Sequence, residues 1–99
     1  MYCVTLLFPN KVGARFDFDY YLSKQVPAIR KSLGDDIRVH RGVSTYDGSS
    51  VPYICQVHIR IDSIESFLEK MSRAGPGLGA EFSRYTNIEP IVQFDEILG

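Results

Sequence analysis

The chain has 99 residues, a formal net charge of −1, and 44% hydrophobic, 12% aromatic and 23% charged residues. This length suits one domain over residues 1–99, and the apolar fraction suffices for a core, which excludes a disordered chain. The near-neutral charge excludes the basic face that nucleic acids require, and no apolar run of about 18 residues could span a bilayer. The N-terminus also lacks the positive flank of a signal peptide, so we expect a cytoplasmic protein with no nucleic-acid or membrane partner.

Four segments carry the pattern of β-strands. Residues 2–8 are apolar on both faces, as in a central strand. Residues 37–46 and 51–62 alternate apolar and polar side chains and flank the turn sequence of residues 47–50 (DGSS), so they predict a hairpin. The last segment, residues 90–98, begins with a proline, which a strand tolerates at its first position.

A first helix is predicted from Asp17 to Leu33, with Asp17 or Asp19 in place to cap its first turn. Its apolar stripe is Phe18, Leu22, Val26, Ile29 and Leu33, with Tyr21 beside it. Pro27 lies inside this segment, lacks a backbone N–H and clashes with the carbonyl of Ser23, so we expect a kink or a break there.

A second helix is predicted from about Ser63 to Arg73, with Ser63 at a capping position. Its apolar stripe is Ile64, Phe67, Leu68 and Met71. The glycine- and proline-rich sequence of residues 74–79 is expected to end this helix. We interpret residues 75–89 as a loop with one helical turn near Glu81, in which the glycines form either a linker or a mobile flap.

The predicted order is β-α-β-β-α-β, which is the ferredoxin-like arrangement of the α+β class. Right-handed crossovers then give a four-stranded antiparallel sheet with both helices on one face. The other face is expected to carry Ile54, Gln56, His58 and Arg60, together with Ile91 or Val92. Because apolar surface is costly in water, we expect a second copy to cover this face in a homodimer. The alternative is a monomer whose polar residues solvate the face.

The two cysteines and two histidines give no clear sign of chemistry. Cys3 and Cys55 lack the spacing of a metal site, and we expect both to be buried thiols. His40 and His58 could stand opposite each other across the hairpin. No metal site is expected there, because the neighbouring arginines oppose a cation and no carboxylate has a matching spacing, so a role in the dimer face is favoured.

Two motifs are similar to those of a known family. Residues 16–27 (FDFDYYLSKQVP) resemble the first-helix signature of the EthD family, which is named for ethyl tert-butyl ether degradation. Residues 81–90 (EFSRYTNIEP) resemble the family's Y-T-N-x-x-P segment before the last strand. The turn at residues 8–10 and the Asp62-Ser63 pair before the second helix also fit, so the resemblance covers nearly the whole chain.

The EthD family belongs to the dimeric α/β-barrel superfamily. The resemblance implies a ferredoxin-like protomer, a homodimer formed through the two sheets, and a small-molecule pocket in each protomer between helices and sheet. Relatives in the superfamily include cofactor-free monooxygenases, polyketide cyclases and dehydratases, and small-molecule isomerases. The resemblance therefore implies no bound cofactor.

The chain departs from the family pattern at two positions. Gln25 stands where the family commonly has a histidine, two residues before Pro27, and Ala74 stands where a second histidine is common. Glutamine cannot titrate, so Gln25 could orient a carbonyl or a phenol but transfer no proton. Glu81 takes the position of the family's usual acidic residue. Glu81 and Gln25 are thus the candidate catalytic residues, with Glu81 as the only candidate base.

The candidate ligand-binding residues are Tyr21, Gln25, Tyr53, Phe82 and Tyr85. Gln25 lies close to the apolar face of the first helix, where a polar side chain needs a partner. One interpretation is that it contacts a ligand together with the aromatic residues. The other is that it is a core glutamine bonded to a backbone carbonyl freed by Pro27.

Two functions are consistent with these patterns. The first is a homodimeric α/β-barrel protein that binds a small apolar or aromatic molecule, such as a carbonyl or phenolic compound, and acts on it as a cofactor-independent oxygenase, cyclase or isomerase. The second is a catalytically silent accessory or interaction protein that retains the fold and the dimer. The replaced histidines favour the second function, and the tyrosines favour the first.

Overall fold

The computed structural model describes all residues from 1 to 99. Its elements are β1 (Tyr2–Pro9), α1 (Phe18–Tyr20), the π-helical turn η1 (Tyr21–Gln25), α2 (Val26–Ser32), β2 (Ile37–Arg41), β3 (Tyr53–Ile61), α3 (Ile64–Gly79), α4 (Phe82–Tyr85) and β4 (Ile91–Glu96). The strands form one antiparallel sheet in the order β2-β3-β1-β4. This confirms the predicted ferredoxin-like arrangement.

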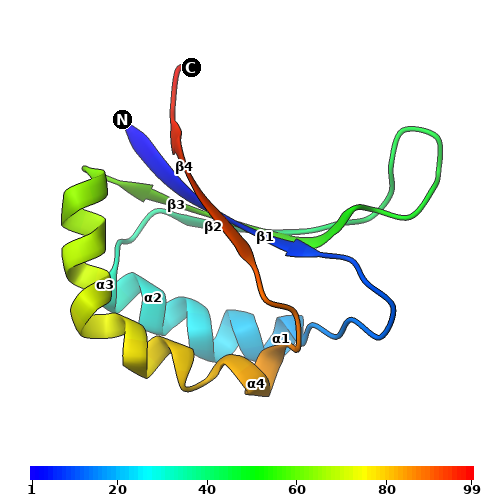
Figure 1. The fold of residues 1–99 in the computed structure, drawn as a ribbon, viewed down its shortest axis with the longest axis horizontal. Coiled ribbons are helices and arrows are strands. Elements are labelled where there is room, and N and C mark those ends of the chain that lie inside the picture. Colours follow the sequence, from blue (N-terminus) through cyan, green and yellow to red (C-terminus); the bar gives the residue numbers. More distant parts are fainter.

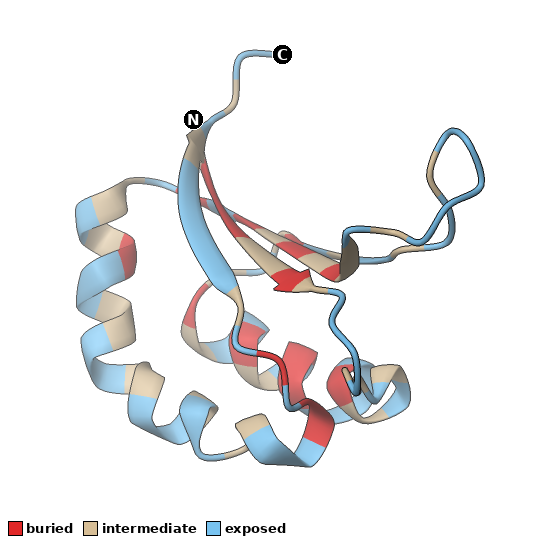
Figure 2. Cartoon of the chain, turned by 45° about the vertical axis from the view of Figure 1, so that its right-hand side comes forward, coloured by how far each residue is buried: buried red, intermediate tan, exposed pale blue.

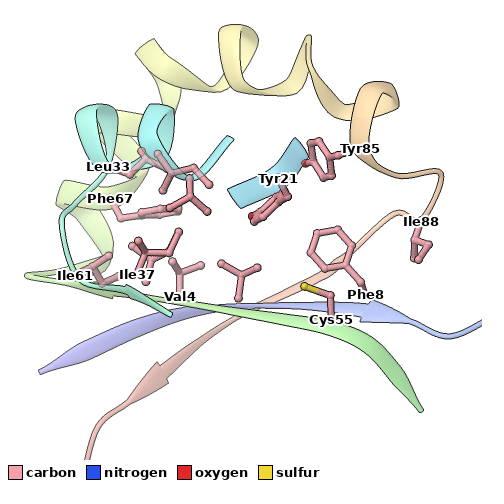
Figure 3. Close-up of a cluster of buried hydrophobic side chains, with 14 residues drawn as sticks. Val4, Phe8, Tyr21, Leu33, Ile37, Cys55, Ile61, Phe67, Tyr85 and Ile88 are labelled. Atoms are coloured by element: carbon pink, nitrogen blue, oxygen red, sulfur yellow. The ribbon is translucent and has the colours of Figure 1, made fainter. Parts of the chain in front are cut away.

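All helices lie on one side of the sheet, and the opposite side is uncovered (Figure 1). The core fills the space between these two layers, where Val4 and Phe8 of β1 are completely buried (Figure 3). Val57 of β3 is completely buried as well. β1 pairs with both β3 and β4, so it has the central position in the sheet that its sequence predicts.

The hairpin strands are shorter than their alternation predicts. β2 ends at Arg41 and β3 begins at Tyr53, and residues 42–52 form a loop that projects from the body of the domain (Figure 1). The predicted turn is present at the tip of this loop, where the Gly48 amide donates to the Thr45 carbonyl at 3.1 Å. The pairing stops early because Val43 is almost fully exposed and finds no apolar partner to continue the ladder.

The break expected at Pro27 is a π-helical turn. The Val26 amide donates to the carbonyl of Tyr21, five residues back, and Pro27 then occupies the first turn of α2, where its missing N–H costs little. The inserted residue shifts the phase of the helix. As a result Tyr21, predicted to lie beside the stripe, is buried in the core, whereas Leu22, predicted to lie in the stripe, is half-exposed.

The second helix is longer than predicted, because α3 continues through its glycines and Pro76 to Gly79. The apolar stripe explains this extension: it runs on from Met71 through Ala74 to Leu78, all of which pack against the core. Tertiary packing thus overrides the low helix propensity of this segment. Leu68, placed in the predicted stripe, is instead half-exposed.

Both predicted caps are present. The Asp17 side chain accepts from the Tyr20 amide, and the Ser63 side chain accepts from the Ser66 amide, each at 3.0 Å. The helical turn expected near Glu81 is α4, which brings Tyr85 into the core. The two caps thus mark where α1 and α3 begin, and α4 adds a further short helix to the layer that faces the sheet.

Candidate ligand-binding site

A cavity of about 290 Å³ lies between the helices and the sheet. It is lined by 15 residues, of which 11 are hydrophobic. Its floor is formed by Val4 and Leu6 of β1, Ile59 of β3 and Val92 of β4, and its roof by residues of η1, α2 and α3. Its size is at the lower end of the range for small-molecule sites, and its apolar lining with few polar groups is typical of them.

Two glycines of α3 leave one wall of this cavity without side chains. Gly75 and Gly79 lie four residues apart and both line it. A Cβ atom at Gly79 would have no neighbour within 4 Å, and one at Gly75 would meet only the end of the Met71 side chain at 3.4 Å. Close packing therefore does not require glycine at either position.

Two tyrosines direct polar groups toward the cavity. Tyr21 is 1% exposed and Tyr85 is 6% exposed, their ring centroids are 4.8 Å apart, and both line the cavity (Figure 3). Neither hydroxyl makes a hydrogen bond within the protein, although a buried tyrosine usually does. No completely enclosed side-chain oxygen or nitrogen lacks a partner, so each of these hydroxyls keeps some accessible surface.

Both hydroxyls are protonated at neutral pH, and burial raises their pKa values further from it. Burial raises the pKa of Tyr21 far above the ordinary value, with a further contribution from neighbouring Tyr85. Burial likewise raises the pKa of Tyr85 to about 12. The pair can therefore donate hydrogen bonds to an acceptor such as a carbonyl oxygen, but cannot serve as a base near neutrality.

Gln25 lies beside the tyrosines and is 5% exposed. Its Nε2 donates to the carbonyl of Leu78 in α3 at 3.3 Å, and its Oε1 has no hydrogen-bond partner in the protein. The carbonyl that it binds belongs to α3, across the helical layer, and is not the Ser23 carbonyl that Pro27 leaves free. The Nε2 atom of Gln25 thus makes a structural hydrogen bond, whereas its Oε1 atom is an acceptor that the protein does not use.

A second hollow, the outer groove, lies between the first helical segment and α3 and has a volume of about 540 Å³. It shares Gln25 and Leu78 with the cavity. Glu81 lines the outer groove and not the cavity. Its Oε2 accepts from the Tyr20 hydroxyl and pairs with Arg84 Nε, each at 2.9 Å. The Glu81 contact raises the pKa of Tyr20.

The structure thus brings Tyr21, Gln25 and Tyr85 together around the cavity and places Glu81 in the adjacent groove. Phe82 packs on the outer side of Tyr85, with ring centroids 5.8 Å apart, and does not line the cavity. Tyr53 begins β3, opposite Pro9, and does not line it either.

Sequence reasoning missed the contribution of α3 to this site. Gly75, Leu78 and Gly79 line the cavity, but their segment was expected to be a loop. The signal that could have placed them is the helical spacing of Met71, Ala74 and Leu78 across the glycine-rich stretch.

The uncovered face of the sheet carries a polar network. Thr5 donates to Asp95 and lies 3.2 Å from His58 Nδ1, and His58 Nε2 lies 3.2 Å from Gln56. His40 and His58 are not directly paired, because His58 stands opposite Arg38, but their ring centroids are 5.3 Å apart. Burial lowers the pKa of His58, and His40 lowers it further. The uncovered face is thus more polar than the apolar sequences of the first and last strands predict.

Two further properties bear on partners. No three His, Cys, Asp or Glu side chains are grouped closely enough to hold a metal ion. None of the helices has the length and apolar character needed to cross a bilayer.

Comparison with known proteins gives no sequence match but several structural ones. No family model matches the chain, and neither does any curated protein. An EthD-like protein from Ralstonia eutropha JMP134 has a TM-score of 0.92 and 26% identity, covering 99% of this chain and 92% of that one. An ethyl tert-butyl ether degradation (EthD) family protein from Bacillus halodurans C-125 has a TM-score of 0.76 and 21% identity, covering 99% of each chain.

A third solved structure, HapK from Hahella chejuensis, has a TM-score of 0.59 and 19% identity, covering 100% of this chain and 95% of that one. At this identity the likeness concerns the fold. The two EthD-like structures match the whole chain, as the motifs at residues 16–27 and 81–90 predict. The chain therefore has the fold of the EthD family from end to end.

Proposed function

We propose that this protein binds a small aromatic molecule carrying a carbonyl group in the cavity beneath the first helix. The ring system occupies the apolar space, and the carbonyl oxygen accepts hydrogen bonds from Tyr21 and Tyr85. Gln25 Oε1 is available to a donor group on the same ligand. The observation that carries the proposal is that two buried tyrosines line the cavity and that neither hydroxyl has a hydrogen-bond partner in the protein.

The alternative, a silent protein with an inert core, is less well supported. A hollow beneath a helix costs stability in proportion to its volume, and so does glycine inside a helix. In this protein the cavity and the helical glycines occur together, since Gly75 and Gly79 of α3 line the cavity. A protein with only a structural role gains nothing from that combination, whereas a binding protein gains the space.

We assign no proton transfer to Glu81. Its carboxylate lies in the outer groove, where Arg84 and Tyr20 already engage it. Gln25 and the two tyrosines supply hydrogen bonds without titrating near neutrality. The proposal is therefore a binding function in which these three side chains fix the orientation of the ligand.

The test compares acetylnaphthalene with ethylnaphthalene, which differ in the carbonyl group, by isothermal titration calorimetry. We expect the ketone to bind about tenfold more tightly, since two hydrogen bonds from otherwise unpaired donors contribute roughly 1–2 kcal/mol. Replacing both tyrosines with phenylalanine should abolish this difference. Equal binding of the two compounds to the unchanged protein would contradict the proposed role of the hydroxyls.

A cavity-filling variant is the matched control. Gly79→Leu places a Cβ atom where nothing lies within 4 Å and a larger side chain at the edge of the cavity, so it should fold normally and weaken binding of both compounds by at least about tenfold. Leu68→Ala, on the exposed side of α3, should leave both affinities unchanged. Unchanged binding to the Gly79→Leu protein would place the ligand elsewhere, and no binding of either compound to the unchanged protein would favour the silent alternative.

We further propose that two copies associate through the uncovered face of the sheet. Leu7 and Ile91 lie opposite each other on that face, and Ile91 is 51% exposed. Val92 points to the helical side, so of the two residues expected on this face Ile91 is the one that occupies it.

The dimer is tested by sedimentation velocity on Ile91→Arg and Leu68→Arg. Both positions are half-exposed and apolar, but Leu68 is on α3, away from the uncovered face. We expect Ile91→Arg to sediment as a monomer and Leu68→Arg to remain dimeric, because a buried unpaired charge is costly at an interface. A monomeric unchanged protein, or two variants that behave alike, would overturn the proposal.

A further inference from the structure

The cavity and the outer groove are separated by a thin and weakly held boundary. They share Gln25 and Leu78, and the hydrogen bond between these two residues is 3.3 Å long, against about 2.9–3.0 Å for a typical N–H···O bond. Leu78 is flanked by Gly77 and Gly79, neither of which would have a neighbour within 4 Å of a Cβ atom. Separating Gln25 from Leu78 would break this long hydrogen bond and join the two hollows, which share both residues.

The outer groove has an excess of positive charge. Lys24 and Arg73 line it from its two sides, and Lys24 is not part of any ion pair in the structure. Arg73 pairs with Glu69 at 3.4 Å, but both side chains are about 70% exposed, so water screens this pair strongly. The carboxylate within the groove, Glu81, already pairs with Arg84. An anionic group entering the groove would thus meet two cations.

We propose that the ligand is an aromatic keto acid that occupies both hollows. Its rings fill the cavity, its ketone meets Tyr21 and Tyr85, and its carboxylate passes between Gln25 and Leu78 to reach Lys24 and Arg73. The displaced Gln25 Nε2 can donate to the ligand instead of to Leu78. This inference rests on the proposed function and adds the acidic end of the ligand to it.

The test measures binding of naphthoylpropionate and its uncharged amide, naphthoylpropionamide, by isothermal titration calorimetry. We expect the acid to bind about fivefold more tightly than the amide at low salt, and this advantage to shrink near physiological salt. Lys24→Gln and Arg73→Gln should each lower affinity for the acid about two- to threefold and leave the amide unaffected. Lys31→Gln, on the same helical segment but outside the groove, is the matched control and should change neither affinity.

Equal affinities of acid and amide for the unchanged protein would overturn the inference while leaving the proposed function in place. The inference also fails if Lys31→Gln reduces binding of the acid as much as Lys24→Gln does, because the effect would then come from overall charge. If neither compound binds and acetylnaphthalene also fails to bind, the proposed function fails as well.

Discussion

The two ends of the core are built in opposite ways. At one end Phe16 contacts Phe8, Phe18, Tyr21 and Tyr85, with ring centroids between 4.6 and 5.6 Å. At the other end α3 presents Gly75 and Gly79 to the sheet and leaves about 290 Å³ empty (Figure 2 shows how little of this helix is buried). We infer that aromatic packing at one end stabilises the fold strongly enough for the other end to remain hollow.

The largest expected effect is at the packed end. Phe8→Ala removes a side chain with no exposed surface and should lower the free energy of unfolding by about 3–5 kcal/mol. Chemical denaturation followed by circular dichroism measures this loss. A loss below about 1 kcal/mol would show that the aromatic cluster does not stabilise the fold as the comparison requires.

Alkaline pH should also destabilise the protein, through groups at the packed end. Burial raises the pKa of the Cys55 thiol to about 12 and that of Tyr85 to about 12. Both groups ionise more easily in the unfolded chain, so the stability they contribute is complete below the ordinary thiol pKa and is lost as pH rises toward 12. Urea midpoints should therefore be flat up to about pH 8 and fall by about pH 11. Tyr85→Phe should make the fall less steep, and midpoints that stay constant throughout would contradict this account.

Filling the hollow end should instead stabilise the protein. Gly79→Ala improves helix propensity without a clash and should raise the free energy of unfolding by about 0.5–1 kcal/mol. Gly77→Ala, which faces the outer groove, should give a similar gain, but only Gly79→Ala should weaken binding of acetylnaphthalene. If Gly79→Ala were destabilising, the wall of the cavity would be closely packed after all.

The smallest expected effect concerns the hydroxyls between the two ends. Tyr21→Phe removes an oxygen that bonds to nothing in the protein, so the free energy of unfolding should change by less than about 0.5 kcal/mol. Thermal and urea denaturation of the two proteins, compared without ligand, measure this difference. A loss above about 1 kcal/mol would reveal a structural partner for the hydroxyl and weaken its assignment to a ligand.

The order of the elements and the fold could be predicted from the sequence because period-two and helical patterns are local. The caps at Asp17 and Ser63 were predictable for the same reason. The π-helical turn was not, because a proline within a helix can be accommodated in several ways. Its consequence, the half-exposed position of Leu22, could not be predicted either.

The cavity could be predicted only in part. Its location beneath the first helix and three of its polar residues, Tyr21, Gln25 and Tyr85, were among those singled out from the sequence. The glycine wall was missed, because the propensities of Gly75 and Pro76 favour a loop and only packing of Leu78 against the core reverses that preference. Empty space between distant elements has no local signature in a sequence.

The most direct test of the tyrosine-lined cavity is the carbonyl carbon-13 resonance of labelled acetylnaphthalene bound to the protein. Donation of hydrogen bonds from Tyr21 and Tyr85 predicts a clear downfield shift relative to the same compound in an apolar solvent, which disappears when both residues are phenylalanine. A bound resonance at the apolar-solvent position, or one that is unchanged in the double variant, would contradict the account.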